Sequence, residues 1–387
     1  MGGTRKVKPQ VLLLGAVALL NDASSDMVYP LLPLFLTLQA GATPLIVGII
    51  EGLAEATAAI LKYTAGTFSD RLPFRKPLVI GGYGLTATSR VIIAAAGAWP
   101  IVLAGRLLDR TGKGIRSAPR DAMIADVTPV ENRGLAFGTL RALDHTGAVI
   151  GPLIAALLLW LGWSLRAVFW TAVVPTIVGV ILLFFIREQK REQTISQDKL
   201  ERPPLDPRFR KAVTAIGLFS LGNSSDAFLL LQASAMGVDM IWIPLLWAAH
   251  HAVKAVLTAK AGAWADATDH RRMILIGWSL YAVLYYIFPF TKTTTGFLTL
   301  FVVYAIPFAL TEGAERAWIA QYLPSSKSGR GFGIYHMVNG AGVLVGTALF
   351  GLLYQVISPV AAFHVGAGFA VLAVMSIFMQ IYNDDQG

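Results

Sequence analysis

The sequence predicts an all-α integral membrane protein with twelve transmembrane helices, in two six-helix halves related by pseudo-two-fold symmetry. The first observation is composition: 55% of the 387 residues are hydrophobic and only 14% are charged. The second is a mean hydropathy of +0.61, more apolar surface than a soluble domain of this length could bury. The third is a duplication, because one pattern recurs 196 residues further along the chain: Gly66, Asp70 and Arg75 are matched by Gly262, Asp266 and Arg271.

Each span is marked by a run of about 20 apolar residues, the length needed to cross a bilayer. The first run is not a cleaved signal peptide, because Asp22 and Asp26 stand where a signal peptide has its apolar region. We place the spans at residues 11–38, 45–69, 76–97, 99–126, 133–160, 164–187, 209–233, 238–264, 271–290, 295–320, 331–356 and 359–382.

One polar stretch divides the chain. Residues 188–208 are expected to form a cytoplasmic linker without chemistry of its own, between an N-terminal half (1–187) and a C-terminal half (209–387). Lys and Arg gather at the N-terminus, after spans two and eight, and in the linker, while opposite turns such as 39–44 and 96–100 have none. This bias predicts a multi-pass protein of the cell (inner) membrane with both termini in the cytoplasm. The net charge of +9 therefore reflects topology, and nucleic acid is not an expected partner.

The duplicated pattern lies between spans two and three and again between spans eight and nine. It resembles the loop signature of the major facilitator superfamily, although Pro73 and Phe74 stand where the family pattern has a Gly. The resemblance covers essentially the whole chain and implies the major facilitator fold and transport by alternating access; we expect a monomer. It also implies that the two loops latch the cytoplasmic side. The residues expected to act in gating are Gly66, Asp70, Arg71, Arg75, Arg120, Asp266 and Arg271.

Span five carries small residues at regular spacing. Gly138, Gly147, Gly151 and Pro152 resemble the antiporter motif of the superfamily's drug/proton antiporters, with Ala155-Ala156 where that motif ends in two glycines. Glycines at this spacing let a neighbouring helix approach closely, and a proline bends a helix. The alternative is ordinary small-residue packing, because span eleven repeats the glycine spacing without the proline.

Acidic residues inside spans are costly and usually functional. Asp22 and Asp26 lie one turn apart on one face of span one, together with Tyr29. Two carboxylates so close in a medium of low dielectric repel, so one of them is a candidate to carry a proton. The alternative is that both are permanently paired with arginines. The residues expected to couple transport to protons are Asp22, Asp26, Asp144 and Asp226. Asp226 belongs to a second Ser-Ser-Asp sequence, which matches the one that ends at Asp26 in span one.

Span four bears a cationic stripe. Arg106, Arg110 and Lys113 share one helical face, and the resemblance implies that this span lines the central cavity. Because Arg binds carboxylate and phosphate through a planar fork, we expect an anionic or zwitterionic small-molecule substrate. The alternative is charge balance with acidic residues. The residues expected to bind substrate are Tyr29, Arg106, Arg110, Lys113, Asn223 and Glu312.

No catalytic triad, HExxH motif or complete phosphate-binding loop is present, and the chain has no cysteine. We therefore expect no enzyme activity, no cofactor and no metal site. The sequence favours a secondary transporter in the lipid bilayer that exports a small organic solute in exchange for protons. The alternatives are a proton symporter for uptake of an organic anion or chelate, and a membrane receptor that does not transport.

Overall fold

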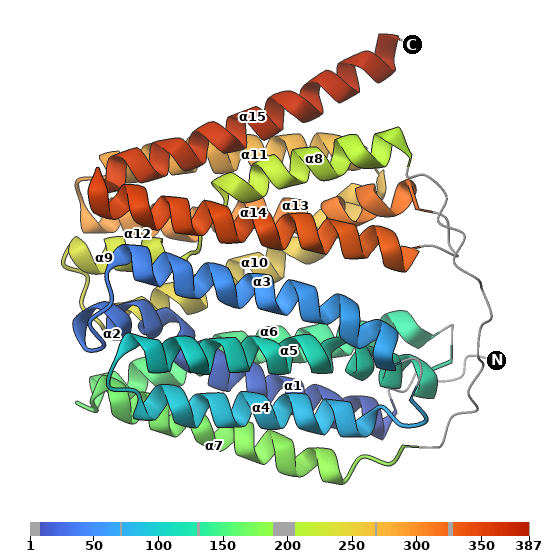
Figure 1. Ribbon diagram of the computed structural model, residues 1–387, viewed down its shortest axis with the longest axis vertical. Coiled ribbons are helices and arrows are strands. Elements are labelled where there is room, and N and C mark those ends of the chain that lie inside the picture. Colours follow the sequence, from blue (N-terminus) through green and yellow to red (C-terminus); the bar gives the residue numbers. More distant parts are fainter. Residues whose placement is uncertain are drawn as a thin grey trace. The chain divides into compact units, whose positions relative to one another are not determined.

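The computed structural model describes residues 8–69, 72–129, 132–188, 206–267, 269–323 and 328–386, and every regular element in these ranges is helical. In chain order the elements are α1 (Pro9–Val28), η1 (Tyr29–Leu31), α2 (Leu32–Leu38), α3 (Pro44–Ser69), α4 (Lys76–Ala95), α5 (Trp99–Val127), α6 (Arg133–Trp160), α7 (Leu165–Phe184), α8 (Pro207–Gly222), α9 (Ala227–Ala235), α10 (Trp242–Ala267), α11 (His270–Ile287), η3 (Phe288–Phe290), α12 (Thr294–Val303), α13 (Ala305–Gln321), α14 (Ser328–Val356) and α15 (Pro359–Gln386) (Figure 1).

The membrane fold expected from the sequence is confirmed. Within the described ranges, 10 helical stretches are long and apolar enough to cross a bilayer. The two other expected spans fall on α5 and α10, helices of 29 and 26 residues. Helix α5 is too rich in charge to count as an apolar span, and those charges are the subject of the next section.

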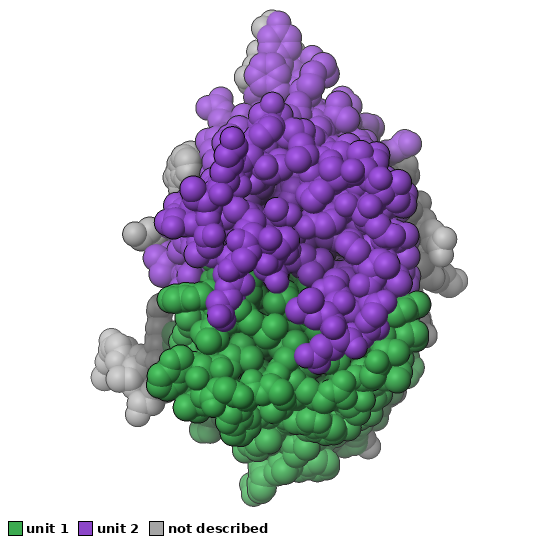
Figure 2. All heavy atoms as spheres, turned by 90° about the vertical axis from the view of Figure 1, so that its left-hand side faces the viewer, with its two compact units in different colours: residues 1–35, 57–199, 240–248 green, residues 36–56, 200–239, 249–387 purple. Residues whose placement is uncertain are grey.

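The chain separates into two compact units (Figure 2). Unit 1 comprises residues 1–35, 57–199 and 240–248, and unit 2 comprises residues 36–56, 200–239 and 249–387. In unit 1, α1 packs against α6 and α7, and α4 packs against α5 and α7 (Figure 1). In unit 2, α8 packs against α14 and α15, and α11 packs against α13 and α15. The pairing is the same in both units, as a duplication predicts.

Glycines set the close approaches within each unit. A side chain at Gly151 of α6 would collide with the carbonyl oxygen of Ala23 in α1, and one at Gly346 of α14 would collide with that of Leu221 in α8. No atom lies within 4 Å of the position that a Cβ would take at Gly138. Two of the glycines of the expected motif, Gly147 and Gly151, therefore fit the packing interpretation, and Gly138 does not.

The glycines also correct the register of the repeat. The loop sequences match at 196 residues, which pairs Gly81 with Gly277. A Cβ at Gly277 would meet Thr311 and Pro307 of α13, and the corresponding crowded glycine of α4 is Gly82, against α5. The interval in these helices is thus 195 residues, because Gly82 rather than Gly81 faces the neighbouring helix.

The first and seventh spans differ in one respect. Helix α1 runs without interruption through Ser24, Ser25 and Asp26. In the seventh span, α8 ends at Gly222 and α9 begins at Ala227, so the second Ser-Ser-Asp sequence lies in a break between two helices. In transporters such breaks place polar backbone and side-chain groups at membrane depth.

Candidate functional site

A cluster of charged side chains lies in unit 1 around Asp109 of α5. Its carboxylate oxygens lie 3.2 Å from Arg90 Nη2 of α4, 3.7 Å from Arg106 Nη1 and 3.8 Å from Arg110 Nε. All four side chains are buried. Three guanidinium groups thus share one carboxylate, and these four side chains carry a surplus of positive charge.

Arg90 ties this cluster to α1. Its Nε donates to Ser24 Oγ at 3.3 Å and its Nη2 donates to Ser25 Oγ at 3.0 Å. Ser24 in turn donates to the carbonyl oxygen of Ala172 in α7 and accepts from Thr176, each at 2.6 Å. Hydrogen bonds to both the serines and the carboxylate hold the guanidinium of Arg90 in one orientation.

A fourth buried guanidinium belongs to Arg116 of α5. It lies 4.3 Å from the ring centroid of Tyr83 and donates to Thr86 Oγ1, both on α4. A ring face and a neutral hydroxyl solvate this cation without neutralising it. Buried cations that outnumber their carboxylates attract an anion, and the planar fork of Arg suits carboxylate or phosphate oxygens.

Asp22 and Asp26, the expected proton carriers of α1, flank the two serines that bond Arg90. Each of them has a separate hydrogen-bond partner. Asp22 Oδ1 accepts from the Asn21 side-chain amide at 3.1 Å. Asp26 Oδ1 accepts from the indole of Trp247 at 3.1 Å, and the ring of Trp247 lies 4.9 Å from that of Tyr29. Both contacts lie within unit 1. The donor that Asp26 bonds is therefore neutral, in contrast to the cations around Asp109.

Tyr29 links the acidic residues to the arginines, because Arg106 Cζ lies 5.5 Å from the centroid of its ring. The structure thus brings together two of the expected substrate-binding residues, Tyr29 and Arg106, and places Arg110 beside them on Asp109. Lys113, also expected to bind substrate, lies one turn further along α5.

Asp144 of α6, a further expected proton carrier, is held by cations. Its carboxylate lies 3.4 Å from Arg141 Nη1 and 3.8 Å from Arg120 Nη1. Arg120 also pairs with Asp121 at 3.0 Å. These contacts match the alternative interpretation, in which acidic residues balance the basic residues of span four.

In unit 2 the second acidic position is surrounded by aromatic residues. Asp226 Oδ1 accepts from the hydroxyl of Tyr304 at 3.0 Å. Tyr285 shares a hydrogen bond with Ser224 Oγ at 2.9 Å, and Tyr281 donates to the carbonyl oxygen of Gly222 at 3.0 Å. Three tyrosine hydroxyls thus hold the break between α8 and α9.

The other polar groups of unit 2 lie along α13. Glu312, expected to bind substrate, pairs with Lys254 at 2.9 Å and with Arg316 at 3.2 Å. Glu315 accepts from the indole of Trp278 at 3.0 Å. Asn223, the other substrate-binding residue expected in this half, is the C-cap residue of α8 at the edge of the break.

The expected gating residues are described in part. Arg75 is buried and pairs with Asp126 of α5, and Arg271 pairs with Asp269 at 2.9 Å. Burial alone would raise the pKa of the Asp269 carboxyl, but hydrogen bonds from Arg271 and the charges of Arg271 and Arg272 hold it below its usual value. Asp70 and Arg71 lie outside the described residues, and so do the surroundings of Gly66 and the side chain of Asp266.

The centre of the cluster was not predicted from the sequence. Arg90 was not among the expected site residues, and Asp109 was not singled out within the cationic run of span four. The available signal was a lone Arg in the middle of an otherwise apolar third span, a position that is costly without a function or a partner. Among the described residues, no three His, Cys, Asp or Glu side chains are grouped as metal ligands.

Comparison with known proteins places this geometry in a family context. The family model described as Major Facilitator Superfamily matches residues 14–259 and 238–385. An uncharacterized MFS-type transporter of Methanocaldococcus jannaschii is 29% identical to this chain, over 98% of the chain and 96% of that relative. Multidrug resistance protein MdtH of Edwardsiella ictaluri is 34% identical over a shorter segment, 34% of this chain and 33% of that protein. The crystal structure of peptide transporter POT in complex with sulfate shares the fold, with a TM-score of 0.82 at 10% identity over 97% of this chain and 94% of that one.

Proposed function

Because the chain belongs to the major facilitator superfamily, a family of membrane transporters, we propose that it exchanges protons for a small organic anion or zwitterion. The proposal rests on one observation, the cluster in unit 1 where Arg90, Arg106 and Arg110 share the carboxylate of Asp109. A substrate that carries a carboxylate or phosphate group would bind to the planar guanidinium groups of this cluster. Arg106, Arg110, Lys113 and Tyr29 are the side chains that we assign to substrate in this unit, and Asn223 and Glu312 are those in unit 2.

Coupling to protons is assigned to Asp22 and Asp26, with Asp144 and Asp226 as further carriers. Asp26 bonds a neutral indole donor, so it can take up a proton without first breaking an ion pair. In exchange, the proton and the substrate occupy the site in turn. A deprotonated Asp26 would bind the cationic group of a zwitterionic substrate whose carboxylate binds the arginines, so proton uptake at Asp26 would favour substrate departure and substrate binding would favour proton release.

Export is the direction that we favour. The glycine-rich face of α6 that packs on α1 resembles the motif of drug/proton antiporters, and one relative is named a multidrug resistance protein. Transport would proceed by alternating access. The protein would act as a monomer in the cell (inner) membrane, with both termini in the cytoplasm. Arg75, Arg120, Arg271, Asp70, Arg71, Gly66 and Asp266 would form the cytoplasmic gate.

Uptake of an organic anion by proton symport is the second candidate. The observation that favours it is the same cluster, because a site rich in arginine suits a charged metabolite better than an apolar drug. The two candidates share a substrate class and differ in the direction in which protons move with the solute.

The test is proton movement in liposomes that contain the purified protein and a pH-sensitive dye. A pH gradient is imposed, and anionic, zwitterionic and cationic solutes are added in turn. Asp26→Asn and Asp22→Asn test the coupling residues. Asp206→Asn is the matched control, because Asp206 caps α8 and lies outside the charged cluster.

Three results decide between the candidates. Antiport predicts that an anionic or zwitterionic solute drives protons in the opposite direction, and that either aspartate variant of α1, but not Asp206→Asn, abolishes the effect. Protons that enter together with the solute would establish the symporter instead. Unchanged coupling in both variants of α1 would show that these carboxylates do not carry the proton.

A further inference from the structure

Helix α4 begins in an electrostatically unfavourable way. Its N-cap residue is Arg75 and its first residue is Lys76, and the first turn contains no acidic residue. The N-terminus of a helix carries partial positive charge and unpaired N–H groups, so basic residues there are disfavoured and a carboxylate is favoured. The side chain of Arg75 makes no capping hydrogen bond to α4 and pairs with Asp126 instead.

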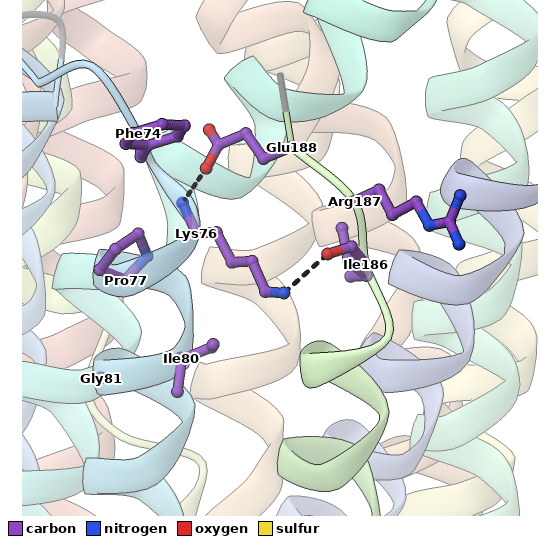
Figure 3. Close-up of a pocket in the computed structure, with 8 residues that line it drawn as sticks. All are labelled: Phe74, Lys76, Pro77, Ile80, Gly81, Ile186, Arg187 and Glu188. Atoms are coloured by element: carbon purple, nitrogen blue, oxygen red, sulfur yellow. Dashed lines mark hydrogen bonds between the residues drawn. The ribbon is translucent and has the colours of Figure 1, made fainter. Parts of the chain in front are cut away.

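The N-terminus of α4 is capped by a carboxylate from the segment after α7, at the C-terminal end of the N-terminal half. Glu188, which follows α7, accepts from the backbone N–H of Arg75 with Oε1 at 2.7 Å and from that of Lys76 with Oε2 at 2.8 Å. The side chain of Lys76 binds in the opposite direction, to the end of α7. Its Nζ donates to the carbonyl oxygen of Phe184 at 2.9 Å. It also donates to the carbonyl oxygen of Ile186 at 2.7 Å (Figure 3). We call these four hydrogen bonds the α4–α7 clasp.

The segment that carries Glu188 is itself fixed to unit 1. Ile186 is buried in a hydrophobic cluster with Val79 and Leu183, which belong to α4 and α7. The side-chain amide of Gln10, in α1, donates to the carbonyl oxygen of Arg187. Glu188 therefore reaches α4 from an anchored position.

In the second half, the corresponding helix is capped by a carboxylate from the adjacent residue. Helix α11 packs in unit 2 as α4 does in unit 1, and it also begins with basic residues, Arg271 and Arg272. Its capping carboxylate belongs to the adjacent Asp269, whose Oδ1 accepts from the backbone N–H of Arg271 at 2.9 Å. The first half has no acid at the corresponding place and takes one from a residue 112 positions away.

From this difference we infer that Glu188 is a positioning residue for the gate: it ties the start of the inter-half linker to the end of the loop that carries the gating motif. Arg75 and Lys76 are the last residues of that motif, and Glu188 is the first residue of the linker. The clasp therefore couples the position of Glu188 to the start of α4. The inference rests on the gating role proposed for this loop, and it would give Glu188 a role that we did not expect of residues 188–208.

The test uses single-cysteine labelling, because the chain has no cysteine of its own. Ile186→Cys places a reporter at the clasp, where the native side chain is 3% exposed. Leu165→Cys places a second reporter at the opposite end of α7, where the native side chain is 4% exposed. The rate of maleimide labelling of each reporter is measured with native Glu188, with Glu188→Ala and with Glu188→Gln.

Asp206→Ala is the matched control, because Asp206 is a capping carboxylate at the other end of the same linker and accepts from the N–H of Arg208 at 2.7 Å. We expect Glu188→Ala to speed labelling at position 186 about fivefold, the factor that corresponds to loss of a capping carboxylate. Glu188→Gln, which keeps the shape but loses the charge and one acceptor, should have an intermediate effect. Labelling at position 165 should stay unchanged, as should labelling at position 186 in Asp206→Ala.

Equal acceleration at both reporters would mean general loosening and would overturn the inference, as would no acceleration at position 186. The labelling assay does not depend on transport, so its result remains valid even if the proposed exchange is wrong.

When a transported solute is known, Glu188→Ala should change kcat and leave KM unchanged, because the clasp contacts none of the arginines assigned to substrate. A change confined to KM would contradict a role in the gate.

Discussion

The two units place different chemistry at corresponding positions. In unit 1, Ser24 accepts from the guanidinium of Arg90; in unit 2, Ser224 bonds the hydroxyl of Tyr285, which lies 195 residues after Arg90. Asp109, which holds three arginines, corresponds at the same interval to Tyr304. The first unit holds a cluster of buried charges, and the second holds packed aromatic rings around Asp226.

The difference teaches that a shared arrangement of helices does not fix the chemistry of its interior. The helix pairs are the same in both units, and so are the close approaches at Gly82 and Gly277. At this interval Arg90 and Asp109 correspond to Tyr285 and Tyr304, and Arg106 and Arg110 correspond to Phe301 and Ala305. All four members of the ionic network are thus replaced by neutral residues in the second unit. Variants at these positions should therefore affect the two units unequally.

The largest effect is expected at the centre of the ionic network. Asp109→Asn leaves three buried guanidinium groups without their carboxylate, and breaking a buried ion pair by removing one partner costs about 3–5 kcal/mol. Thermal unfolding in detergent measures this loss. Asp121→Asn is the matched control, because Asp121 pairs with Arg120 but its side chain is 38% exposed. Equal stability of the two variants would show that the network is not a stabilising element.

The aromatic unit should respond less to the loss of its corresponding group. Tyr304→Phe keeps the ring but removes the hydroxyl that donates to Asp226, and a hydrogen bond to a charged group contributes about 1.5–3 kcal/mol. The same thermal unfolding assay applies. Tyr286→Phe, at a residue that is 55% exposed, should change nothing measurable. A loss at Tyr304 as large as that at Asp109 would remove the contrast between the units.

Glycine packing should be sensitive in both units alike. Gly151→Ala and Gly346→Ala each put a Cβ onto a backbone carbonyl of the neighbouring helix. Overpacking of this kind costs about 1–3 kcal/mol. Gly138→Ala, at a position with open space, should be neutral or slightly stabilising because alanine favours a helix. Unequal losses at Gly151 and Gly346 would show that the antiporter-like face of α6 packs differently from its counterpart in α14.

The smallest effect concerns the local cap of α11. The pKa of the Asp269 carboxyl lies below its ordinary value of 3.8, so its stabilising effect is complete above that pH and is lost as the pH falls through the lowered value. The difference in melting temperature between the native protein and Asp269→Asn should be constant from pH 5 to pH 8, on the basis of this linkage, and should shrink in stronger acid. A difference that grows on acidification would contradict the direction of the shift.

Much of the fold could be predicted because the physical signals were strong. Each of the twelve expected spans falls on one helix or on two consecutive helices, since long apolar runs have few alternatives in a membrane. Family membership also confirms the expectation that the chain is a transporter rather than an enzyme. The register was wrong by one residue at Gly81, because sequence matching of short loops cannot tell which of two adjacent glycines faces a neighbour.

The candidate site was predicted less completely. The cationic face of span four was recognised, but its partner Arg90 lies on another helix, and only packing brings α4 and α5 together. The break before Asp226 was not expected, because the same three residues form continuous helix in span one. The roles assigned to Asp22, Asp26, Asp226 and the arginines remain predictions.

The break between α8 and α9 has a mechanical consequence. A helix held by its own backbone bonds resists bending along its whole length, whereas this span is joined at one place by the hydroxyls of Tyr281, Tyr285 and Tyr304. These side-chain bonds can be exchanged one at a time, so the two pieces can tilt against each other without unwinding either. In the first span α1 continues through its acidic residue and the helix changes only afterwards, at η1, whereas the seventh span has its break directly before its acidic residue.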